Sequence, residues 1–488
     1  MKQPFDIPAI KVMLSKSADV VCREFRIGKD GVNIDAILFY TDGLVDTKAI
    51  QDFILETLMI EVDKTDLISN RLKDYITAGD ISTVEDTEML YHHLFSGHAI
   101  LLLNRGSLCY SIGMYAAKGR EVADSIGETV IRGPKEAFTE TIRINTALIR
   151  RKIKNPNLWL ENRQIGKITK TDVSIMYING IVNDSIVQEV RDRLDQIDID
   201  GILESQYIEE LIQDDIYTPF PTMYNTERPD VIAAELLEGK VAILVDGTPH
   251  VLIVPALFIS FLHSAEDYYQ RADISSLLRM LRFVGIFIAL LGPSLYIAIT
   301  TFHQEMLPTP LLISLAAQRE GIPFPALIEA LMMEITFEVL REAGIRMPRP
   351  IGQAISIVGT LVIGQAAVEA GIVSAAMVIV VSITAISSFV VPSINMSISI
   401  RMIRFIIMGL AASFGLYGIV IGILALILHL CSLRSFGIPY MTPFGPYNAD
   451  AKRDTIFRLP FWAMKTRPRL VSQKNVTRNK TKPPGPNR

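Results

Sequence analysis

The chain has 488 residues, of which 49% are hydrophobic, and its mean hydropathy is +0.31. This composition is too apolar for an ordinary soluble protein of that length and indicates a membrane protein. The formal net charge of −4 gives no indication of a nucleic-acid partner. The three cysteines, Cys22, Cys109 and Cys431, are too few and too scattered for a disulfide framework or a CxxC metal site.

The first half of the chain, residues 1 to about 250, contains no apolar run of membrane length. Its first thirty residues carry charged side chains and lack a sustained apolar core, so we expect no cleavable signal sequence. We therefore expect this half to be cytoplasmic. Its patterns predict two small α/β subdomains, over residues 1–153 and 165–255.

In the first subdomain, residues 36–45 and 98–104 have the composition of strands that end in turn residues. Residues 47–59 between them have a helical apolar pattern. A break between the subdomains is expected near residues 154–164.

The second subdomain alternates between strand and helix patterns. We expect a strand at residues 171–180, helices at 184–197 and 228–239, and a hairpin at 240–255 that turns at Asp246 and Gly247. This alternation predicts a small sheet of the βαβ type.

Catalytic and cofactor motifs are weak throughout. The segment QIGKITK (164–170) lacks the earlier glycine that a phosphate loop needs. His92, His93 and His98 have no carboxylate at ligand spacing, and neither GxSxG nor HExxH occurs. We therefore expect no enzyme activity, cofactor or metal.

The second half carries the apolar runs. A membrane domain is expected over residues 275–434, followed by a basic cytoplasmic tail at 435–488 whose end, after about residue 470, has a disordered composition. Runs free of Asp, Glu, Lys and Arg predict four transmembrane helices, at about 283–302, 351–368, 374–391 and 405–431. The predicted fold class is thus an α/β cytoplasmic region followed by an α-helical polytopic membrane domain.

Basic residues near the spans predict the orientation. Arg271, Arg279 and Arg282 precede the first span and the basic tail follows the last, so both termini should be cytoplasmic and the number of spans even. Four spans would place Arg341, Arg346 and Arg349 outside, against this rule. Either the helix that carries them also crosses, with a further crossing or re-entrant segment, or the rule is overridden here.

An amphipathic helix is expected at residues 324–343, between the first two spans. Glu334, Glu338 and Glu342 recur every four residues and form a carboxylate stripe on this helix. Two ion pairs are possible by spacing, Glu338 with Arg341 and Glu342 with Arg346. The helix could lie along the membrane surface, or these five residues could form a cation vestibule or couple to a gate.

The second span has one small and polar face. Its members fall three or four residues apart and oppose Ile355, Val358 and Val362. This face could line a pore, or it could allow close helix packing, for which small residues are also typical. The candidate pore-lining residues are Gln353, Ser356, Thr360, Gly364 and Ala367.

Long blocks of the sequence resemble one known family. They begin with VIRGPKEAFTETIRINTALIRR and end with SFGIPYMTPFGP, and they are similar to the A subunit of the GerA spore germination receptors. The resemblance covers nearly the whole chain after about residue 30. The blocks are residues 130–151, 226–258, 264–271, 307–374 and 435–446.

The resemblance implies a multi-pass protein of the spore inner membrane. It implies two partners, a transporter-like B subunit that binds the nutrient and a lipoprotein C subunit. It also implies that A subunits form a homo-oligomer, a pentamer, that acts as a ligand-gated cation channel in contact with membrane lipid. A related branch that accompanies the SpoVA channel shares many of these blocks, so the chain could instead be an accessory channel subunit of that branch. A carrier-type transporter is the other alternative, although the uneven spans offer no inverted repeat.

Overall fold

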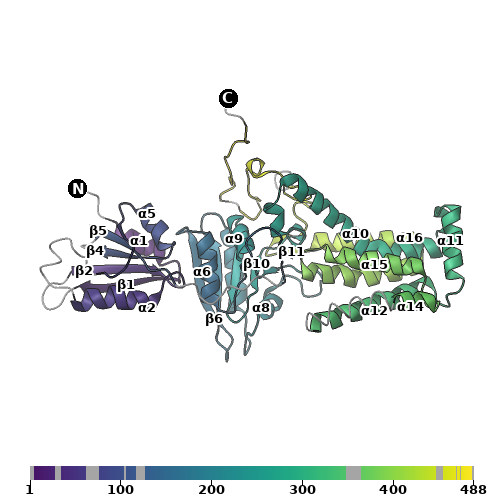
Figure 1. Ribbon diagram of the computed structural model, residues 1–488, viewed down its shortest axis with the longest axis horizontal. Coiled ribbons are helices and arrows are strands. Elements are labelled where there is room, and N and C mark those ends of the chain that lie inside the picture. Colours follow the sequence, from purple (N-terminus) through teal and green to yellow (C-terminus); the bar gives the residue numbers. More distant parts are fainter. Residues whose placement is uncertain are drawn as a thin grey trace.

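The computed structural model describes residues 5–27, 34–61, 76–103, 106–116, 127–347, 364–446, 454–468, 470–472 and 474–485. In these ranges the chain forms two α/β units followed by a bundle of helices, arranged in that order along the long axis of the molecule (Figure 1). The predicted fold class, two small α/β units followed by a helical region, is confirmed.

The first unit is a five-stranded antiparallel sheet in the order β1-β2-β4-β5-β3, with helices on both faces. Helix α2 and its π-helical continuation η1 cover one face, and α1 and α5 cover the other. The central strand β4 is buried on both faces, which explains its unbroken apolar run. The strands are β1 (Val20–Ile27), β2 (Ile34–Thr41), β3 (Ile81–Thr83), β4 (His98–Leu103) and β5 (Leu108–Gly113), and the helices are α1 (Ile7–Leu14), α2 (Thr47–Ile50), η1 (Gln51–Glu61) and α5 (Thr87–Leu94).

The second unit is again a five-stranded antiparallel sheet, in the order β6-β7-β9-β10-β8. Helices α7 and α8 pack on one face, and α6 and α9 pack on the other. The strands are β6 (Leu158–Ile165), β7 (Thr171–Ile178), β8 (Tyr224–Thr226), β9 (Val241–Val245) and β10 (Val251–Val254), and the helices are α6 (Ile142–Lys152), α7 (Asp184–Asp195), α8 (Ser205–Ile212) and α9 (Pro229–Leu237).

Two expectations for this unit are wrong, although the hairpin of β9 and β10 is confirmed. The expected break at 154–164 is largely the edge strand β6, in which Leu158 and Leu160 are buried while the polar residues after them face outward. The expected βαβ arrangement is absent from the described residues, because β7 and β9 are antiparallel. More than one helix and the short strand β8 separate β7 from β9, and the chain returns in the opposite direction.

The two units share one topology. Each sheet has the same strand order when its strands are numbered along its own segment. In each, a helix ends a few residues before a glycine with positive φ, Gly97 (+94°) or Gly239 (+93°), and an apolar strand follows. The corresponding segments of the two units, SGHAILLLN (96–104) and EGKVAILVD (238–246), have few identical residues. The sequence contains no fixed-period repeat, yet the backbone plan occurs twice.

A buried arginine fastens the first unit to the helix that opens the second. Arg150 on α6 is fully buried and donates to the Asp19 carboxylate at 2.7 and 2.9 Å and to Ser17 Oγ at 2.7 Å. Its guanidinium also lies 4.7 Å from the centre of the Phe95 ring. A buried charge of this kind requires its partner, so the pair fixes how the two units meet.

The helical bundle follows two short 3-10 turns, η3 (Phe258–Leu262) and η4 (Ala265–Tyr268). Among the described residues, two helices, α10 and α16, are long and apolar enough to cross a membrane. The bundle contains α10 (Ala272–Thr301), η5 (Gln304–Met306), α11 (Thr309–Arg319), α12 (Ala326–Arg346), α14 (Gly364–Glu369), α15 (Ala375–Phe389) and α16 (Ile394–Ser432), and after it come β11 (Arg434–Ser435), β12 (Ile438–Pro439) and η8 (Phe461–Ala463).

Helix α16 is a hairpin of two antiparallel arms that meet at Gly415. This glycine has φ +62° and ψ −141°, which lie outside the helical region and which L side chains rarely adopt. Gly422 lies against Ile407 and Leu410 of the first arm. Both ends of the hairpin reach the second α/β unit, through Ser399 bonded to Pro219 O and His429 bonded to Thr218 at 2.9 Å. The turn falls inside the span expected at 405–431, so residues 405–414 belong to the first arm and residues 416–431 to the second.

The other expected spans correspond less directly to helices. Residues 283–302 lie almost wholly in α10, and 374–391 contain α15, which at 15 residues is only about 22 Å long. Most of 351–368 lies outside the described residues, and α14 begins at Gly364. The membrane crossings and the domain boundaries stay predictions.

The C-terminal tail packs against the C-terminal end of α9. Ser472 is buried and donates to Ile181 O at 2.8 Å, and Arg467 donates to Leu237 O at 2.7 Å. Arg478 pairs with Glu238. The expected disorder after about residue 470 is wrong for this stretch, because its basic residues meet the acidic side chains and free carbonyl groups at the end of α9.

The positive φ of Gly239 gives a test of this arrangement. A Cβ at this position would lie 3.0 Å from Ser472 Cβ and 3.2 Å from Ile181 O. We expect Gly239→Ala to lower the free energy of unfolding by about 1 to 3 kcal/mol, measured by denaturation of the detergent-solubilised chain. Gly79→Ala is the control, because a Cβ added there would have no atom within 4 Å, and equal losses would contradict the prediction.

Candidate functional site

The carboxylate stripe lies on α12, as predicted, but its three members have different surroundings. The Glu334 side chain is 1% exposed, that of Glu338 is 28% exposed and that of Glu342 is 60% exposed. The helix packs against α15 and α16 through Ala330 and its neighbours. The stripe therefore runs from the helix interface out to the surface.

Glu334 forms a fully buried ion pair with Arg404 on the first arm of α16, with 3.0 Å between Oε1 and the guanidinium nitrogen. Both side chains are 1% exposed. Removing two charges from water is costly, and their attraction offsets that cost only while both are present. The pair thus holds α12 and α16 in one register.

Glu338 extends the pair into a charged cluster. It pairs with Arg401 on α16, approaches Arg341 at 3.4 Å and lies 3.9 Å from Arg404. Arg341 also donates to Ser388 Oγ on α15 at 2.9 Å. We call these five residues the α12 charge cluster: Glu334, Glu338, Arg341, Arg401 and Arg404. It joins three helices, and it lies in the half of the bundle beside the α/β units, because Ser399, five residues before Arg404, contacts Pro219.

The two local ion pairs predicted on α12 are confirmed. Glu338 and Arg341 belong to the cluster, whereas Glu342 and Arg346 form a separate pair at 2.7 Å on the surface. Arg401 and Arg404 could not be selected from the sequence, since both lie more than sixty residues from their partners. Their one visible signal is their position just before an apolar run.

Glu329 was missed as well. It is fully buried at the start of α12, and its Oε1 accepts hydrogen bonds from both the backbone and the hydroxyl of Ser374. Ser374 caps the N-terminus of α15 by accepting from Met377 N. The carboxylate therefore lies where the helix dipole favours a negative charge.

The candidate pore-lining residues are only partly described. Gln353, Ser356 and Thr360 lie outside the described residues. Gly364 is buried on α14, where an added Cβ would lie 3.7 Å from Val378 on α15, and Ala367 is half-buried. Neither residue lies at the α12 charge cluster. Gly364 is next to Val378, near the start of α15, whereas Arg341 of the cluster contacts Ser388, near the end of α15.

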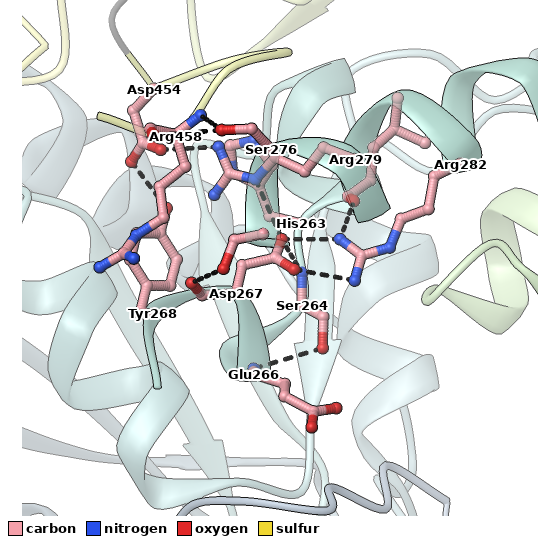
Figure 2. Close-up of polar contacts among 12 residues, drawn as sticks. His263, Ser264, Glu266, Asp267, Tyr268, Ser276, Arg279, Arg282, Asp454 and Arg458 are labelled. Atoms are coloured by element: carbon pink, nitrogen blue, oxygen red, sulfur yellow. Dashed lines mark hydrogen bonds and ion pairs between the residues drawn. The ribbon is translucent and has the colours of Figure 1, made fainter. Parts of the chain in front are cut away.

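A second polar network lies where the second α/β unit, α10 and the tail meet (Figure 2). Asp267 on η4 is 1% exposed and accepts from Arg279 at 3.0 Å and from Arg282 at 2.6 and 2.8 Å. Arg279 also donates to Asp454 of the tail at 2.7 Å, and Tyr268 donates to the same carboxylate at 2.7 Å. We call this group the junction network.

The protonation of the junction network follows from these contacts. Burial raises the pKa of Asp267, but the hydrogen bonds and charges of Arg282 and Arg279 outweigh it, and the net pKa is below the usual range. His263 donates from Nε2 to Thr455 O at 3.3 Å. Burial, aided by the charge of Arg279, lowers the pKa of His263 to about 4. The network is therefore built from two ionised carboxylates, two arginines and a neutral histidine at neutral pH.

The buried cluster predicts a large difference between two glutamates of one stripe. We expect Glu334→Ala to lower the free energy of unfolding by about 3 to 5 kcal/mol, because Arg404 would stay buried without its partner. Denaturation of the solubilised chain measures this. Glu342→Ala is the matched control and should change it by less than about 0.5 kcal/mol.

Replacing both Glu334 and Arg404 by Leu should restore most of the lost stability, since no unpaired charge then remains. Equal costs for Glu334→Ala and Glu342→Ala would contradict the burial of the pair.

His263 predicts a pH dependence of the junction. An unfolded histidine binds a proton near pH 6.5, whereas His263 does so at about 4, so the folded junction should lose stability as pH falls between these values. Trypsin cleavage at the exposed Lys465 should therefore become faster from pH 7 to pH 5, after correction for the enzyme's own pH profile. His263→Gln keeps a donor for Thr455 and should flatten this dependence; an unchanged slope in that variant would assign it to another group.

Comparison with known proteins identifies relatives along nearly the whole chain. The family model described as "Bacillus/Clostridium GerA spore germination protein" matches residues 8–470. Spore germination protein KA of Bacillus subtilis (strain 168) is 47% identical over 475 residues, which are 97% of this chain and 87% of that protein. Spore germination protein B1 of the same organism is 41% identical over 466 residues, 95% of this chain and 96% of that protein.

One solved structure is also similar. It is the crystal structure of the N-terminal domain of the A subunit of the Bacillus megaterium spore germinant receptor GerK3, with 44% sequence identity and a TM-score of 0.41. The match covers 52% of this chain and 94% of that one.

Proposed function

The chain belongs to the GerA family of Bacillus/Clostridium spore germination proteins, and from this membership we propose that it is the A subunit of a nutrient-responsive germination receptor. The observation that carries the proposal is the length of the match, residues 8–470, which includes both α/β units and the bundle. Its relatives KA and B1 are spore germination proteins by name, and each is covered over most of its own length.

The helical bundle is proposed to cross the spore inner membrane several times, with both termini on the cytoplasmic side. The apolar helices α10 and α16 support this. Arg279 near the start of α10 contacts Asp454 in the tail, so the chain enters and leaves the bundle at the same end. Basic residues gather at that end, as is usual on the cytoplasmic side.

Copies of the chain are proposed to assemble, as a pentamer, into a channel for monovalent cations. In one copy, Glu334 is neutralised by Arg404 and closed to water, so it is a poor attractor of cations. We assign it to gate coupling, because the α12 charge cluster joins the three helices that a gate would have to move. Glu342, which is exposed, is the better vestibule candidate, and the small face of residues 353–367 is the proposed pore wall.

The proposed partners are a transporter-like B subunit and a lipoprotein C subunit, with the nutrient bound mainly in the B subunit. Membership of the germination-protein family supports a complex with other germination subunits. Ion selectivity would then follow from the assembled pore, whose walls are contributed by several copies.

Ion flux tests the channel. The full chain, reconstituted in liposomes with its partners, should release potassium when nutrient is added, and Gly364→Leu should block this release by adding apolar bulk where water must pass. Because the longer side chain would also meet Val378, assembly must be measured in parallel by size-exclusion chromatography. Gly364→Ala, which fits at 3.7 Å, is the control and should leave both flux and assembly unchanged.

Cysteine substitutions distinguish a pore-lining role of this face from a helix-packing role. Positions 353, 356, 360 and 364 should react with water-soluble thiol reagents in the activated state, and 355, 358 and 362 should not. Equal protection of both faces in a protein that assembles normally would refute the pore wall, and loss of assembly in Gly364→Leu without a flux defect per complex would favour packing.

A further inference from the structure

The first half of α10, residues 272–284, directs its polar side chains inward. Ser275 and Arg279 are buried, and the Arg282 side chain is 11% exposed. All three contact Asp267, through the two arginine pairs and through a hydrogen bond from Ser275 Oγ to the Asp267 carbonyl oxygen at 2.7 Å. At about 100° for each residue, they lie within an arc of about 60° on the helix. The junction network therefore occupies this side of α10.

The opposite side of this segment is apolar and exposed. Its large apolar residues are Ile274, Leu277, Leu278, Met280, Leu281 and Val284. Leu277 is 66% exposed and Leu281 is 56% exposed. A surface helix of a soluble domain has the reverse arrangement, with its apolar side on the core and its polar side in water. An exposed apolar side of this size indicates a surface that another apolar phase or molecule covers.

The segment precedes the part of α10 that runs along the bundle. A Cβ added to Gly285 would lie 3.5 Å from both Ser387 O and Val390 Cβ, so residue 285 is level with the end of α15. At the other end of α10, His303 Nε2 accepts from Leu416 N at 3.3 Å, beside the turn of the α16 hairpin. Residues 285–302 cover about 27 Å, close to the roughly 30 Å of a bilayer core. Residues 272–284 add about 20 Å before it, and Figure 1 shows this first part of α10 slanting away from the other bundle helices.

The exposed apolar side continues into the part of α10 proposed to cross the membrane. Leu295, which is 38% exposed, lies about five turns after Leu277 at about 3.6 residues per turn, so the two project from the same side of the helix. Lipid that covers Leu295 would therefore meet Leu277 along one continuous surface. At its other end the apolar side stops at Asp273, which is exposed and pairs with Arg271 at 2.8 Å. A charged pair at this end and lipid at the other are the two boundaries of a membrane–water interface.

We propose that residues 272–284 lie in the membrane–water interface, with Leu277 and Leu281 in the lipid and the junction network on the water side. The inference rests on the membrane crossing proposed above and goes beyond it, because it assigns lipid contact to a segment before the crossing. A helix with one apolar side and one charged side is stable at this depth. Asp267 would then hold the second α/β unit at the membrane surface, and a displacement of that unit would tilt α10.

The test is fluorescence quenching of the full chain in liposomes of phosphatidylcholine and phosphatidylglycerol. One cysteine carries the fluorophore, on a background in which the exposed Cys22 and Cys431 are replaced by serine. A label at Leu277→Cys or Leu281→Cys should be quenched by lipids with brominated acyl chains and only weakly by iodide in the water. Tyr207→Cys, at an exposed apolar position on α8, is the water control and should show the reverse.

A label at Leu295→Cys separates this inference from the crossing on which it rests. Lipid quenching at 295 with iodide quenching at 277 and 281 would overturn the interfacial segment alone. Iodide quenching at 295 as well would overturn the crossing too. Protection of 277 and 281 from both quenchers would assign the apolar side to a second copy or a partner subunit, which also overturns the proposal.

A pair of polar replacements tests what keeps the segment in the lipid. Leu277→Gln with Leu281→Gln should cause a label at Ile274→Cys to lose its lipid quenching, because the apolar side is interrupted while the inward polar side is unchanged. Tyr207→Gln with Leu211→Gln, at exposed apolar positions of α8, is the matched control and should leave the label at 274 unaffected. Unchanged lipid quenching in the first pair would contradict the proposal.

Discussion

The carboxylate of Asp267 is the point on which the arrangement of soluble and helical parts depends. It is buried between two arginines of α10 that are three residues apart, a spacing that places Arg279 and Arg282 on one side of the helix. None of these three charges could stay buried without its partners. These contacts fix the position of the start of α10 against the second α/β unit. Asp454, which also pairs with Arg279, fixes the tail at the same place.

The second α/β unit reaches the bundle at more places than this. Pro219 and Thr218 contact the two ends of the α16 hairpin, and Asp267 holds the start of α10. The hairpin in turn carries Arg404, the partner of Glu334 on α12. A displacement of the α/β unit would thus reach α12 through the first arm of α16 and a buried ion pair, which gives the proposed gate coupling a continuous physical path.

The sequence predicted what local pattern determines. The apolar runs of β4 and β9, the hairpin after β9, the helix that became α12 and its ion pairs at spacings of three and four residues all follow from neighbours along the chain. The turn at Gly415 could not be foreseen, because glycine is common in apolar helices and the run continues on both sides. Asp267 could not be selected either, since Asp454, with which it shares Arg279, lies far along the chain in the tail. The repeated topology could not be recognised in the sequence, because the two units share turn positions and a burial pattern but few identical residues.

The carboxylate stripe shows why even a correct pattern left the site undecided. A step of four residues turns an α-helix by about 400°, so each glutamate is displaced by about 40° from the one before. Three glutamates therefore cover an arc of about 80°, which is wide enough to begin inside a helix contact at Glu334 and end in the open at Glu342. Spacing alone makes the three equivalent, and only the position of α16 makes one of them a buried anchor and another an exposed charge. A function assigned to the stripe as a whole would thus be wrong for at least one of its members.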